Sequence, residues 1–430
     1  MTATVAIVAP AQAQQGAAVL TGKVIDANSK KAVADAVVTV TSSSLQGEQI
    51  VTTDNSGTYR IPALPPGVYT LHLDKEGFKP YQRDQIQLRA DATIRLDADL
   101  LPEGLVAAEV VVVAHAPTVD VGSSTIGASM NSDFTSRVPV TNPGAHGGGA
   151  RTFESVAEAT PGASADQYGT SISGTSSPEN SYVIDGARSN SSKFGTNAAP
   201  LSIEFVKEVN VLSGGYMPEY GRSTGGILNV VTKSGSNEYH GDVWANWTPG
   251  SIEGKRKYPY FTGTAIQTHR SLDNVYDVGF DQSGPIVKDK LWYFVGFGVA
   301  RTIFNLDRSI HESSLDGAGN TISTAEIPGT NQQFKASSTQ YQLFARLDYR
   351  INQDNKIALT FVGTPASSGG GGDYAINPQS GQVENPNATG DVNLIGTYGA
   401  TAHANRSGAY NTVLKWTSEF DNKSKNLETT

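Results

Sequence analysis

Alternation of apolar and polar side chains with a period of two residues is the feature that most restricts how this chain can fold. It is clearest at residues 340–351, where the apolar set is Tyr341, Leu343, Ala345, Leu347 and Tyr349 and the polar set is Gln340, Gln342, Arg346, Asp348 and Arg350. Successive side chains of a β-strand point to opposite faces, so the pattern predicts a strand with one apolar and one polar face. A strand between lipid and a wet lumen shows this pattern, and so does a strand of a soluble sandwich.

Connection lengths help to separate these two possibilities. Six strands can be drawn, at residues 239–247, 274–283, 290–301, 340–351, 356–363 and 408–420. Strands two and three join through residues 284–289 and strands four and five through residues 352–355, whereas the other connections are long and rich in Gly, Ser, Asn and Pro. Short turns at one end and long loops at the other are typical of an outer-membrane β-barrel.

Aromatic residues near the strand ends agree with this interpretation. They are Trp244, Trp247, Trp292 and Tyr293. Such residues form girdles where strands cross the membrane interfaces. The alternative is that they are core residues of an ordinary β-sandwich.

The first hundred residues predict a small all-β domain. Short β-branched runs at residues 20–26, 36–42, 49–54, 58–64, 68–74 and 92–100 are separated by turn signals, as in a β-sandwich. Residues 54–57, Asp-Asn-Ser-Gly, predict a hairpin turn, because a calcium loop needs further carboxylates that are absent here.

The middle of the chain predicts a compact domain that ends at the first long alternating strand. Residues 203–241 contain two β-prone runs joined by glycine turns. Upstream, residues 151–162 predict one or two helical turns, Asp185 and Gly186 form a turn pair, and Ser202 is placed to cap a short helix.

The run GGYMPEYGRSTGGILNVVTKSGSNEYHGDVW, residues 214–244, resembles the end of the plug domain and the first barrel strand of TonB-dependent outer-membrane receptors. The resemblance is closest to the Oar-like branch, which has an extra N-terminal domain, and it covers nearly the whole chain. Residues 22–78 look like a carboxypeptidase-regulatory-like domain.

The resemblance implies a mainly β fold: an N-terminal β-sandwich, an α+β plug domain and the first strands of a truncated antiparallel transmembrane β-barrel. The expected divisions are residues 1–13, a signal-peptide remnant; 14–108, the sandwich; 109–142, a TonB-box-like segment and linker; 143–237, the plug; and 238–430, six barrel strands. Barrels of this family have about twenty-two strands. Because an open sheet edge in hydrocarbon leaves backbone groups unpaired, we expect the chain to be the N-terminal part of a longer receptor.

A valine run follows the first domain, formed by Glu109, Val110, Val111, Val112, Val113 and Ala114. Such a run favours an extended backbone that pairs as a strand. The resemblance implies a TonB box, which adds as an edge strand to the periplasmic protein TonB. The alternative is a last strand of the preceding sandwich.

Two plug charges stand out, Glu219 and Arg222. The resemblance implies that such charges pair with the inner barrel wall as an ionic lock. The alternative is a solvated turn, where exposed ion pairs contribute little.

The remaining features argue against catalysis. The chain has no cysteine, and its seven histidines show no metal-ligand spacing. No nucleophile elbow, phosphate loop or dinucleotide fingerprint occurs, so we predict no enzyme activity, no cofactor and no metal. A net charge of −9 disfavours nucleic acid as a partner.

The first residues contain a short apolar stretch and Ala11-Gln12-Ala13, which fits a signal-peptidase site. They predict the tail of a secretory signal, and the alternative is a disordered Ala/Gln leader. Export through the periplasm to the outer membrane of a Gram-negative bacterium is then expected.

Taken with the resemblance, the expected function is energised transport of a ligand across the outer membrane, with the plug gating the barrel. The expected partners are TonB, outer-membrane lipid and an extracellular ligand, which could be an oligosaccharide, a peptide or an iron chelate. The alternative function is a secreted soluble β-sandwich module for adhesion or carbohydrate binding. A peptidase-associated accessory module fits only the first hundred residues.

Overall fold

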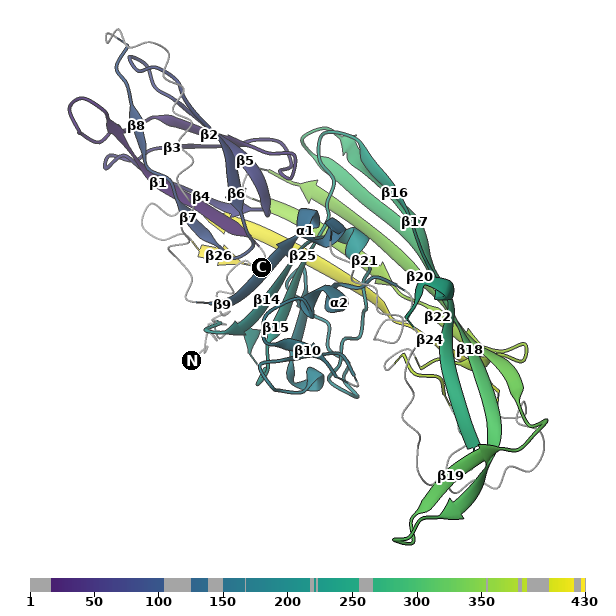
Figure 1. Ribbon diagram of the computed structural model, residues 1–430. Coiled ribbons are helices and arrows are strands. Elements are labelled where there is room, and N and C mark those ends of the chain that lie inside the picture. Colours follow the sequence, from purple (N-terminus) through teal and green to yellow (C-terminus); the bar gives the residue numbers. More distant parts are fainter. Residues whose placement is uncertain are drawn as a thin grey trace, which may run out of the picture.

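A computed structural model describes residues 17–103, 125–137, 150–166, 168–216, 220–221, 223–254, 266–352, 355–377, 381–384, 402–420 and 427–429. These residues form three parts: an N-terminal sandwich, a plug and a long sheet (Figure 1). The mainly β fold class expected from the sequence is confirmed. The expected signal remnant at residues 1–13 lies outside the described residues.

The N-terminal sandwich consists of two four-stranded sheets. One has the order β4-β1-β7, with β8 also paired to β1, and the other has the order β3-β2-β5-β6. The strands are β1 Ala18–Asp26, β2 Val37–Thr41, β3 Gln49–Thr52, β4 Thr58–Leu64, β5 Gly67–Asp74, β6 Tyr81–Leu88, β7 Thr93–Arg95 and β8 Ala98–Leu100.

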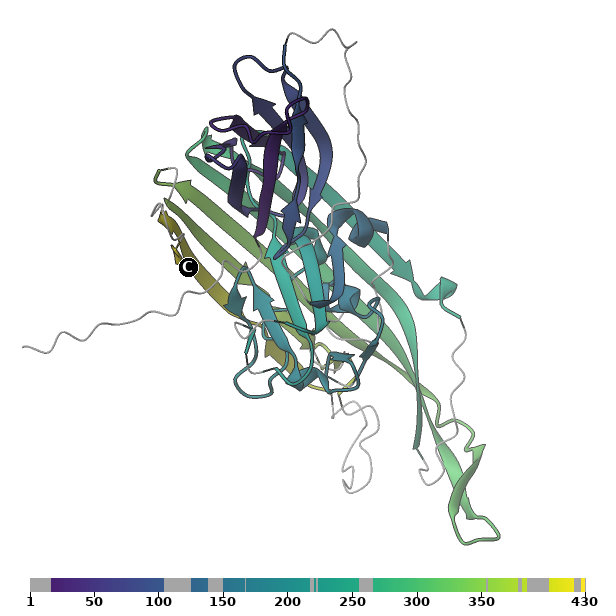
Figure 2. The same ribbon diagram turned by 90° about the vertical axis from the view of Figure 1, so that its left-hand side faces the viewer.

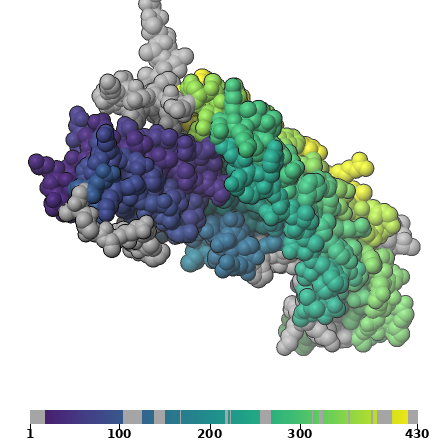
Figure 3. Space-filling model, turned by 90° about the horizontal axis from the view of Figure 1, so that it is seen from above, coloured from purple at the N-terminus to yellow at the C-terminus, as the bar shows by residue number. Residues whose placement is uncertain are grey.

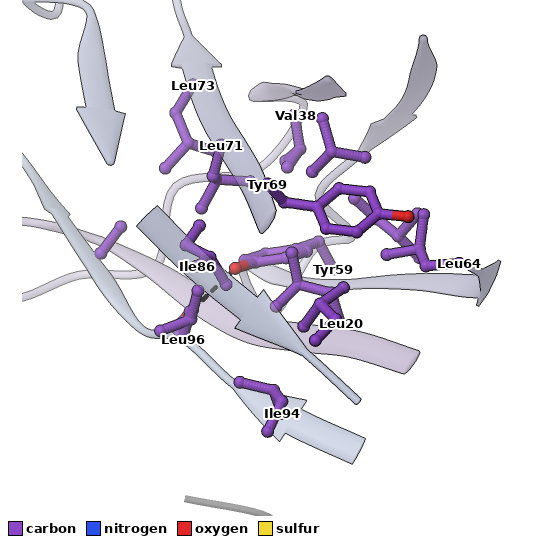
Figure 4. Packing of buried hydrophobic residues seen from close by; sticks show 14 of the residues in the cluster. Leu20, Val38, Tyr59, Leu64, Tyr69, Leu71, Leu73, Ile86, Ile94 and Leu96 are labelled. Atoms are coloured by element: carbon purple, nitrogen blue, oxygen red, sulfur yellow. Dashed lines mark hydrogen bonds between the residues drawn. The ribbon is translucent and has the colours of Figure 1, made fainter. Parts of the chain in front are cut away.

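Alternation buries one face of each sandwich sheet in a shared core (Figure 4). In β5, Tyr69, Leu71 and Leu73 are buried and the residues between them are not. The hydroxyl of buried Tyr59 donates to the Leu96 carbonyl oxygen over 2.8 Å, so this polar atom keeps a partner inside the core. The core of the sandwich is therefore apolar, and the Tyr59 hydroxyl inside it has a hydrogen-bond partner.

The structure of the sandwich differs from the expectation at two points. The turn at residues 54–57 joins β3 to β4, which lie in different sheets, so it is a turn between sheets and not a hairpin turn. Its carboxylate, Asp54, accepts from the backbone N–H groups of Ser56 and Thr58. Strand β6 was not predicted, because Gln, Arg and Asp fill most of it and only Ile86 and Leu88 are buried.

The plug is built on a five-stranded sheet with the order β13-β12-β15-β14-β9. Strands β12 and β15 are parallel, and the other neighbours are antiparallel. The elements are β9 Ile126–Asn131, α1 Ser132–Arg137, α2 Phe153–Ala157, β10 Ala163–Ala165, β11 Thr170–Ile172, η1 Ser177–Glu179, β12 Ser181–Ile184, β13 Ala187–Arg188, η2 Ile203–Phe205, β14 Val206–Gly214 and β15 Ile227–Thr232.

Local predictions for the plug are confirmed at three points. Helix α2 supplies the expected helical turns, and Gly162 follows with a φ of 81°. The Ser202 side chain accepts from the backbone N–H of Glu204 and caps η2. Asp185 and Gly186 both have positive φ, 50° and 86°, in the two-residue turn between β12 and β13. One difference is that β9 and α1, expected in a linker, belong to the plug.

All six predicted long strands occur, in chain order, in one antiparallel sheet. They are β16 His240–Pro249, β17 Ile266–Val287, β18 Leu291–Leu315, β20 Gln332–Arg350, β21 Asn355–Gly363 and β25 Tyr410–Phe420. Shorter elements complete the sheet: β19 Thr321–Glu326, β22 Ala366–Gly369, β23 Tyr374–Ala375, β24 Ala404–Ser407 and β26 Leu427–Thr429; a turn, η4 Gly250–Ile252, follows β16. Strands β17, β18 and β20 run well beyond their predicted ends.

The predicted turn at residues 284–289 is wrong in extent. Strand β17 continues to Val287, and only residues 288–290 form the turn to β18. Gly284 and Pro285 look like strand breakers in the sequence. The ladder shifts register between Pro285 and Val287, and such an irregularity is where a strand tolerates proline.

A sheet of a soluble protein exposes its polar face and buries its apolar face, and the long sheet does the reverse. The exposed apolar side chains that the cross-strand register places on one face include Val243, Trp247, Tyr276, Val278, Phe280, Val295, Phe297, Tyr341, Leu347, Tyr349, Leu359, Leu414 and Trp416. On the other face, Gln342 and Asp348 are buried. The plug lies against this polar face (Figure 2).

The predicted aromatic girdle is wrong for two of its four residues. Trp292 is fully buried, and its indole N–H donates to the Asn237 side chain. Trp244 packs on Phe205 of the plug. Both residues lie on the plug side of the sheet, because position within a period of two, and not closeness to a strand end, decides which face a side chain takes. Trp247 is 64% exposed on the outer face.

The N-terminal sandwich lies at the end of the long sheet that has the short turns, and the β18–β19 extension lies at the opposite end (Figure 1). Seen from above, the sandwich packs beside the strands of the sheet and above the plug (Figure 3). The plug is therefore enclosed by the sandwich at one end and by the sheet along its side.

Candidate functional site: the plug and sheet interface

An aromatic cluster joins the plug to the sheet. Phe205, at the end of η2, is fully buried, and its ring stacks on Phe344 with centroids 5.5 Å apart. It also meets Trp244 edge-on at 5.7 Å and Phe294 at 6.4 Å. A Cβ at Gly296 would lie 2.2 Å from the Phe205 ring, so only glycine at this point of β18 lets the ring approach the sheet.

A polar cluster lies beside the aromatic one. Arg346 of β20 contacts Asp185 of the plug at 3.2 Å and Asp348 of its own strand at 2.9 Å. The Thr232 hydroxyl donates to Asp185 over 2.6 Å and accepts from Arg346 over 2.9 Å. The acidic side chains are only 8% and 7% exposed. Because buried charges need partners, this cluster fixes the plug against the sheet; we call Asp185, Thr232, Arg346 and Asp348 the polar lock.

Further polar contacts cross the same interface. Lys233 of the plug pairs with Asp281 of β17 at 3.2 Å. The Gln342 side chain accepts from the backbone N–H of Ser202 over 3.2 Å and donates to the Pro200 carbonyl over 3.1 Å. The interface is therefore held by side chains of both the plug and the sheet.

A cavity of about 360 Å³ lies next to the polar lock. It is bounded by the sandwich, the plug and the sheet, and the basic side chains that line it are Lys207, Lys233, His240, Arg346, Lys356 and Lys415. Burial, together with the nearby positive charge of Lys233, lowers the pKa of Lys207. Acidic residues also line it, among them Asp185, Asp242, Asp281 and Asp348. Charged side chains of both signs thus line the cavity between the plug and the sheet.

The site residues predicted from the sequence all lie outside the described residues. This holds for Glu109, Val110, Val111, Val112, Val113 and Ala114, and for Glu219 and Arg222. Both assignments stay predictions. The polar lock uses other residues, although its two principal members were visible in the sequence: Asp185 as a turn residue and Arg346 on the polar face of the fourth strand.

Within the part of the chain that the structure describes, no group of three or more His, Cys, Asp or Glu side chains could hold a metal ion.

Among the described residues, no helix has both the length and the apolar character needed to span a membrane.

Comparisons with known proteins agree with the architecture. Residues 19–101 match the carboxypeptidase regulatory-like domain, and residues 132–227 match the TonB-dependent receptor plug domain. The chain is 51% identical over 386 residues to the TonB-dependent transporter Oar of Myxococcus xanthus. The aligned region covers 87% of this chain and 36% of that protein. The chain thus spans about a third of the length of this curated relative.

Solved receptor structures are also similar to part of this chain. The ferric enterobactin receptor of Pseudomonas aeruginosa is 16% identical, with a TM-score of 0.42, over 69% of this chain and 39% of that chain. The siderophore receptor PirA of Acinetobacter baumannii is 14% identical, with a TM-score of 0.34, over 69% of this chain and 46% of that chain.

The sequence comparisons confirm the family to which the residues at 214–244 pointed. The two domain matches occur in the order expected from the sequence, and the identity to Oar extends over most of the chain. The chain belongs to the TonB-dependent receptors of the Gram-negative outer membrane, in the Oar-like branch that has a carboxypeptidase regulatory-like domain before the plug.

Proposed function

We propose that this chain supplies the plug and the first wall strands of an energised outer-membrane transporter. The observation that carries the proposal is the inverted sheet, whose apolar face is exposed while the plug covers its polar face. Outer-membrane lipid is then the partner of the apolar face. On this proposal residues 14–108 form the sandwich, 109–142 carry the TonB-binding segment, 143–237 form most of the plug and 238–430 begin the wall.

The plug acts as the gate in this proposal. Phe205 and the polar lock tie it to the wall, so a ligand can pass only after these contacts separate. The contacts near the cavity are largely polar, and their hydrogen bonds can be replaced by bonds to water at a net cost of about 1 kcal/mol each. On this side the plug can therefore move without exposing a large apolar surface, whereas movement at Phe205 separates the aromatic cluster. We retain Glu219 and Arg222 as further lock candidates.

Residues 109–114 are the proposed attachment point for TonB. The segment joins the last strand of the sandwich to β9, the first strand of the plug. A β-prone run in that position can pair with an edge strand of a periplasmic partner. Pulling on it transmits force directly to the plug.

The ligand is proposed to enter from the end of the sheet that carries the long β18–β19 extension. An oligosaccharide, a peptide and an iron chelate are the candidate classes. The exposed apolar face of the sheet disfavours the alternative of a secreted soluble module, because contiguous apolar patches of this kind mark membrane or partner surfaces.

The test is deletion of residues 109–114 in the full-length receptor. Energised uptake of a labelled ligand is expected to stop, while binding of that ligand to cells stays at the wild-type level. Restoring uptake with a six-residue Gly/Ser segment of equal length would contradict the proposal, because such a segment lacks the strand-forming valines.

A further inference from the structure

A tight turn of the sandwich contacts the plug. Asp91 has a left-handed backbone, with φ of 60°, which Asp tolerates better than most residues. The turn is tied to the first strand by the Asp91 N–H, which donates to the Ala17 carbonyl over 3.2 Å, and by the Val19 N–H, which donates to Ala92 over 2.9 Å. The turn therefore presents the Asp91 carboxylate in a fixed direction.

That carboxylate meets two buried side chains of the plug. The Tyr220 hydroxyl and the Asn229 side-chain amide each donate to Asp91 Oδ2 over 2.8 Å. Tyr220 is 4% exposed and Asn229 is 1% exposed. Charge-assisted bonds in a dry setting are stronger than neutral bonds at a surface, so Asp91 is a specific anchor for the sandwich.

A second contact in the same turn reaches the edge of the plug. The Ala90 N–H donates to Glu208 Oε1 over 3.1 Å, and Glu208, on β14, is 2% exposed. The same oxygen accepts from the Ser129 hydroxyl of β9. One buried acceptor thus holds both the sandwich and the first strand of the plug.

Strand β9 carries Ser129, the second donor to this acceptor. It lies at the edge of the plug sheet and pairs only with β14 among the described strands. Edge strands open more readily than central ones, because one side of their backbone makes no hydrogen bonds to a neighbouring strand. A donor that holds the Glu208 carboxylate in place beside Ser129 therefore slows the opening of β9.

The sandwich is also held at the sheet. The Arg350 guanidinium, at the end of β20, donates to the Gln46 carbonyl. A Cβ at Gly47, the next residue, would lie 3.3 Å from the Asp289 carboxylate and 3.4 Å from Arg350. Contacts on two sides, to the plug and to the short-turn end of the sheet, give the sandwich a defined place.

We propose that the sandwich is a clasp that keeps the closed plug in place, with Asp91 and Glu208 as its latch residues, and that it must separate from the plug before β9 can leave β14. The inference rests on the proposed function in one respect: the segment proposed to bind TonB lies between the sandwich and β9 in the sequence. A pull on this segment therefore acts on both the sandwich and β9. Because of the clasp, the sandwich leaves the plug and β9 leaves β14 in one concerted step.

Hydrogen exchange of the β9 amides tests the clasp in the resting full-length receptor, in lipid vesicles without TonB. The Asp91→Ala variant is expected to raise their exchange rates about tenfold, because the sandwich loses its anchor. The Asp91→Asn variant keeps an oxygen that accepts from Tyr220 and Asn229, so its rates are expected to stay within about twofold of wild type. Glu76→Ala, an exposed change of the same charge in the same domain, is the matched control.

A second variant separates loss of the clasp from damage to the sandwich. Tyr220→Phe removes one bond to Asp91 from the plug side and leaves the sandwich sequence intact, and faster β9 exchange is expected here too. Wild-type exchange in both Asp91→Ala and Tyr220→Phe overturns the clasp. The readout needs neither TonB nor a ligand, so uptake that survives deletion of residues 109–114 would reject the proposed function and leave the clasp standing.

Discussion

The N-terminal sandwich and the long sheet use the same alternating pattern in opposite ways. In β5 the apolar residues Tyr69 and Leu71 are buried. In β20 the apolar residues Tyr341 and Leu347 are 40% and 42% exposed, while Asp348 is 5% exposed. Alternation therefore shows that a strand has two different faces, but the surroundings decide which face is covered.

The largest expected effect is a charge placed in the core of the sandwich. Leu71→Lys buries an ammonium group in a fully apolar core, because Leu71 is 0% exposed. We expect the free energy of unfolding of the sandwich to fall by about 5 kcal/mol or more, enough to unfold a small domain. Proteolysis of the sandwich strands in the intact receptor measures this. A wild-type cleavage pattern would show that the sandwich face is not a core.

The next largest effect is loss of the polar lock. Arg346→Ala leaves the buried Asp185 and Asp348 without the guanidinium that contacts both, at an expected cost of about 3–5 kcal/mol to the closed plug. Faster hydrogen exchange in β12, which Asp185 follows, and in β15, which ends at Thr232, measures it. The control is Arg95→Ala on the sandwich, whose pair with Asp97 is about half exposed and is worth under about 1 kcal/mol. Equal effects of the two changes would contradict the lock.

A leucine-to-lysine substitution should destabilise the long sheet less than it destabilises the sandwich. Leu347→Lys places the charge on the exposed apolar face, where lysine costs about 2–4 kcal/mol at the middle of a bilayer and less near its surfaces. The measurement is the denaturant midpoint of the receptor in lipid vesicles. Leu347→Lys should also lower the yield of folded receptor in vesicles but not in detergent, where the long side chain can reach water.

The smallest expected effect concerns pH and Glu208. Burial raises the pKa of Glu208 above its ordinary value of 4.5, although the hydrogen bond from Ser129 opposes this. The folded plug thus holds this proton to higher pH than the unfolded chain does, so its stability falls as pH rises from about 4.5 through the folded pKa. Glu208→Gln keeps an acceptor oxygen and removes the ionisation. Unfolding measured between pH 4 and 7 should therefore show a shallower decline in Glu208→Gln, and parallel curves would count against a raised pKa.

Much of the fold could be predicted because its signals are local. The six long strands follow from the period-two pattern, and the Asp185-Gly186 turn and the Ser202 cap follow from residues adjacent in sequence. Strand β6 could not be predicted in this way, because its core contacts come only from Ile86 and Leu88. A mostly polar edge strand has almost no local pattern.

The candidate site was harder to predict, because its partners come together only in three dimensions. Asp185 and Arg346 are 161 residues apart. The sequence places Arg346 on a polar face and Asp185 in a turn, but it does not show which plug charge that face meets. The faces of Trp244 and Trp292 were also missed, because nearness to a strand end does not reveal the face.

The most direct test of the inverted sheet is site-directed spin labelling along β20 in lipid vesicles. These 430 residues contain no cysteine, so within them each introduced cysteine carries the only label. Collision with oxygen, which dissolves in lipid, should peak at residues 341, 343, 345, 347 and 349 and fall at 342, 344, 346 and 348, where the plug covers the strand. Equal oxygen collision at both sets, or a peak at the even-numbered residues, would contradict a sheet with lipid on its apolar face and the plug on its polar face.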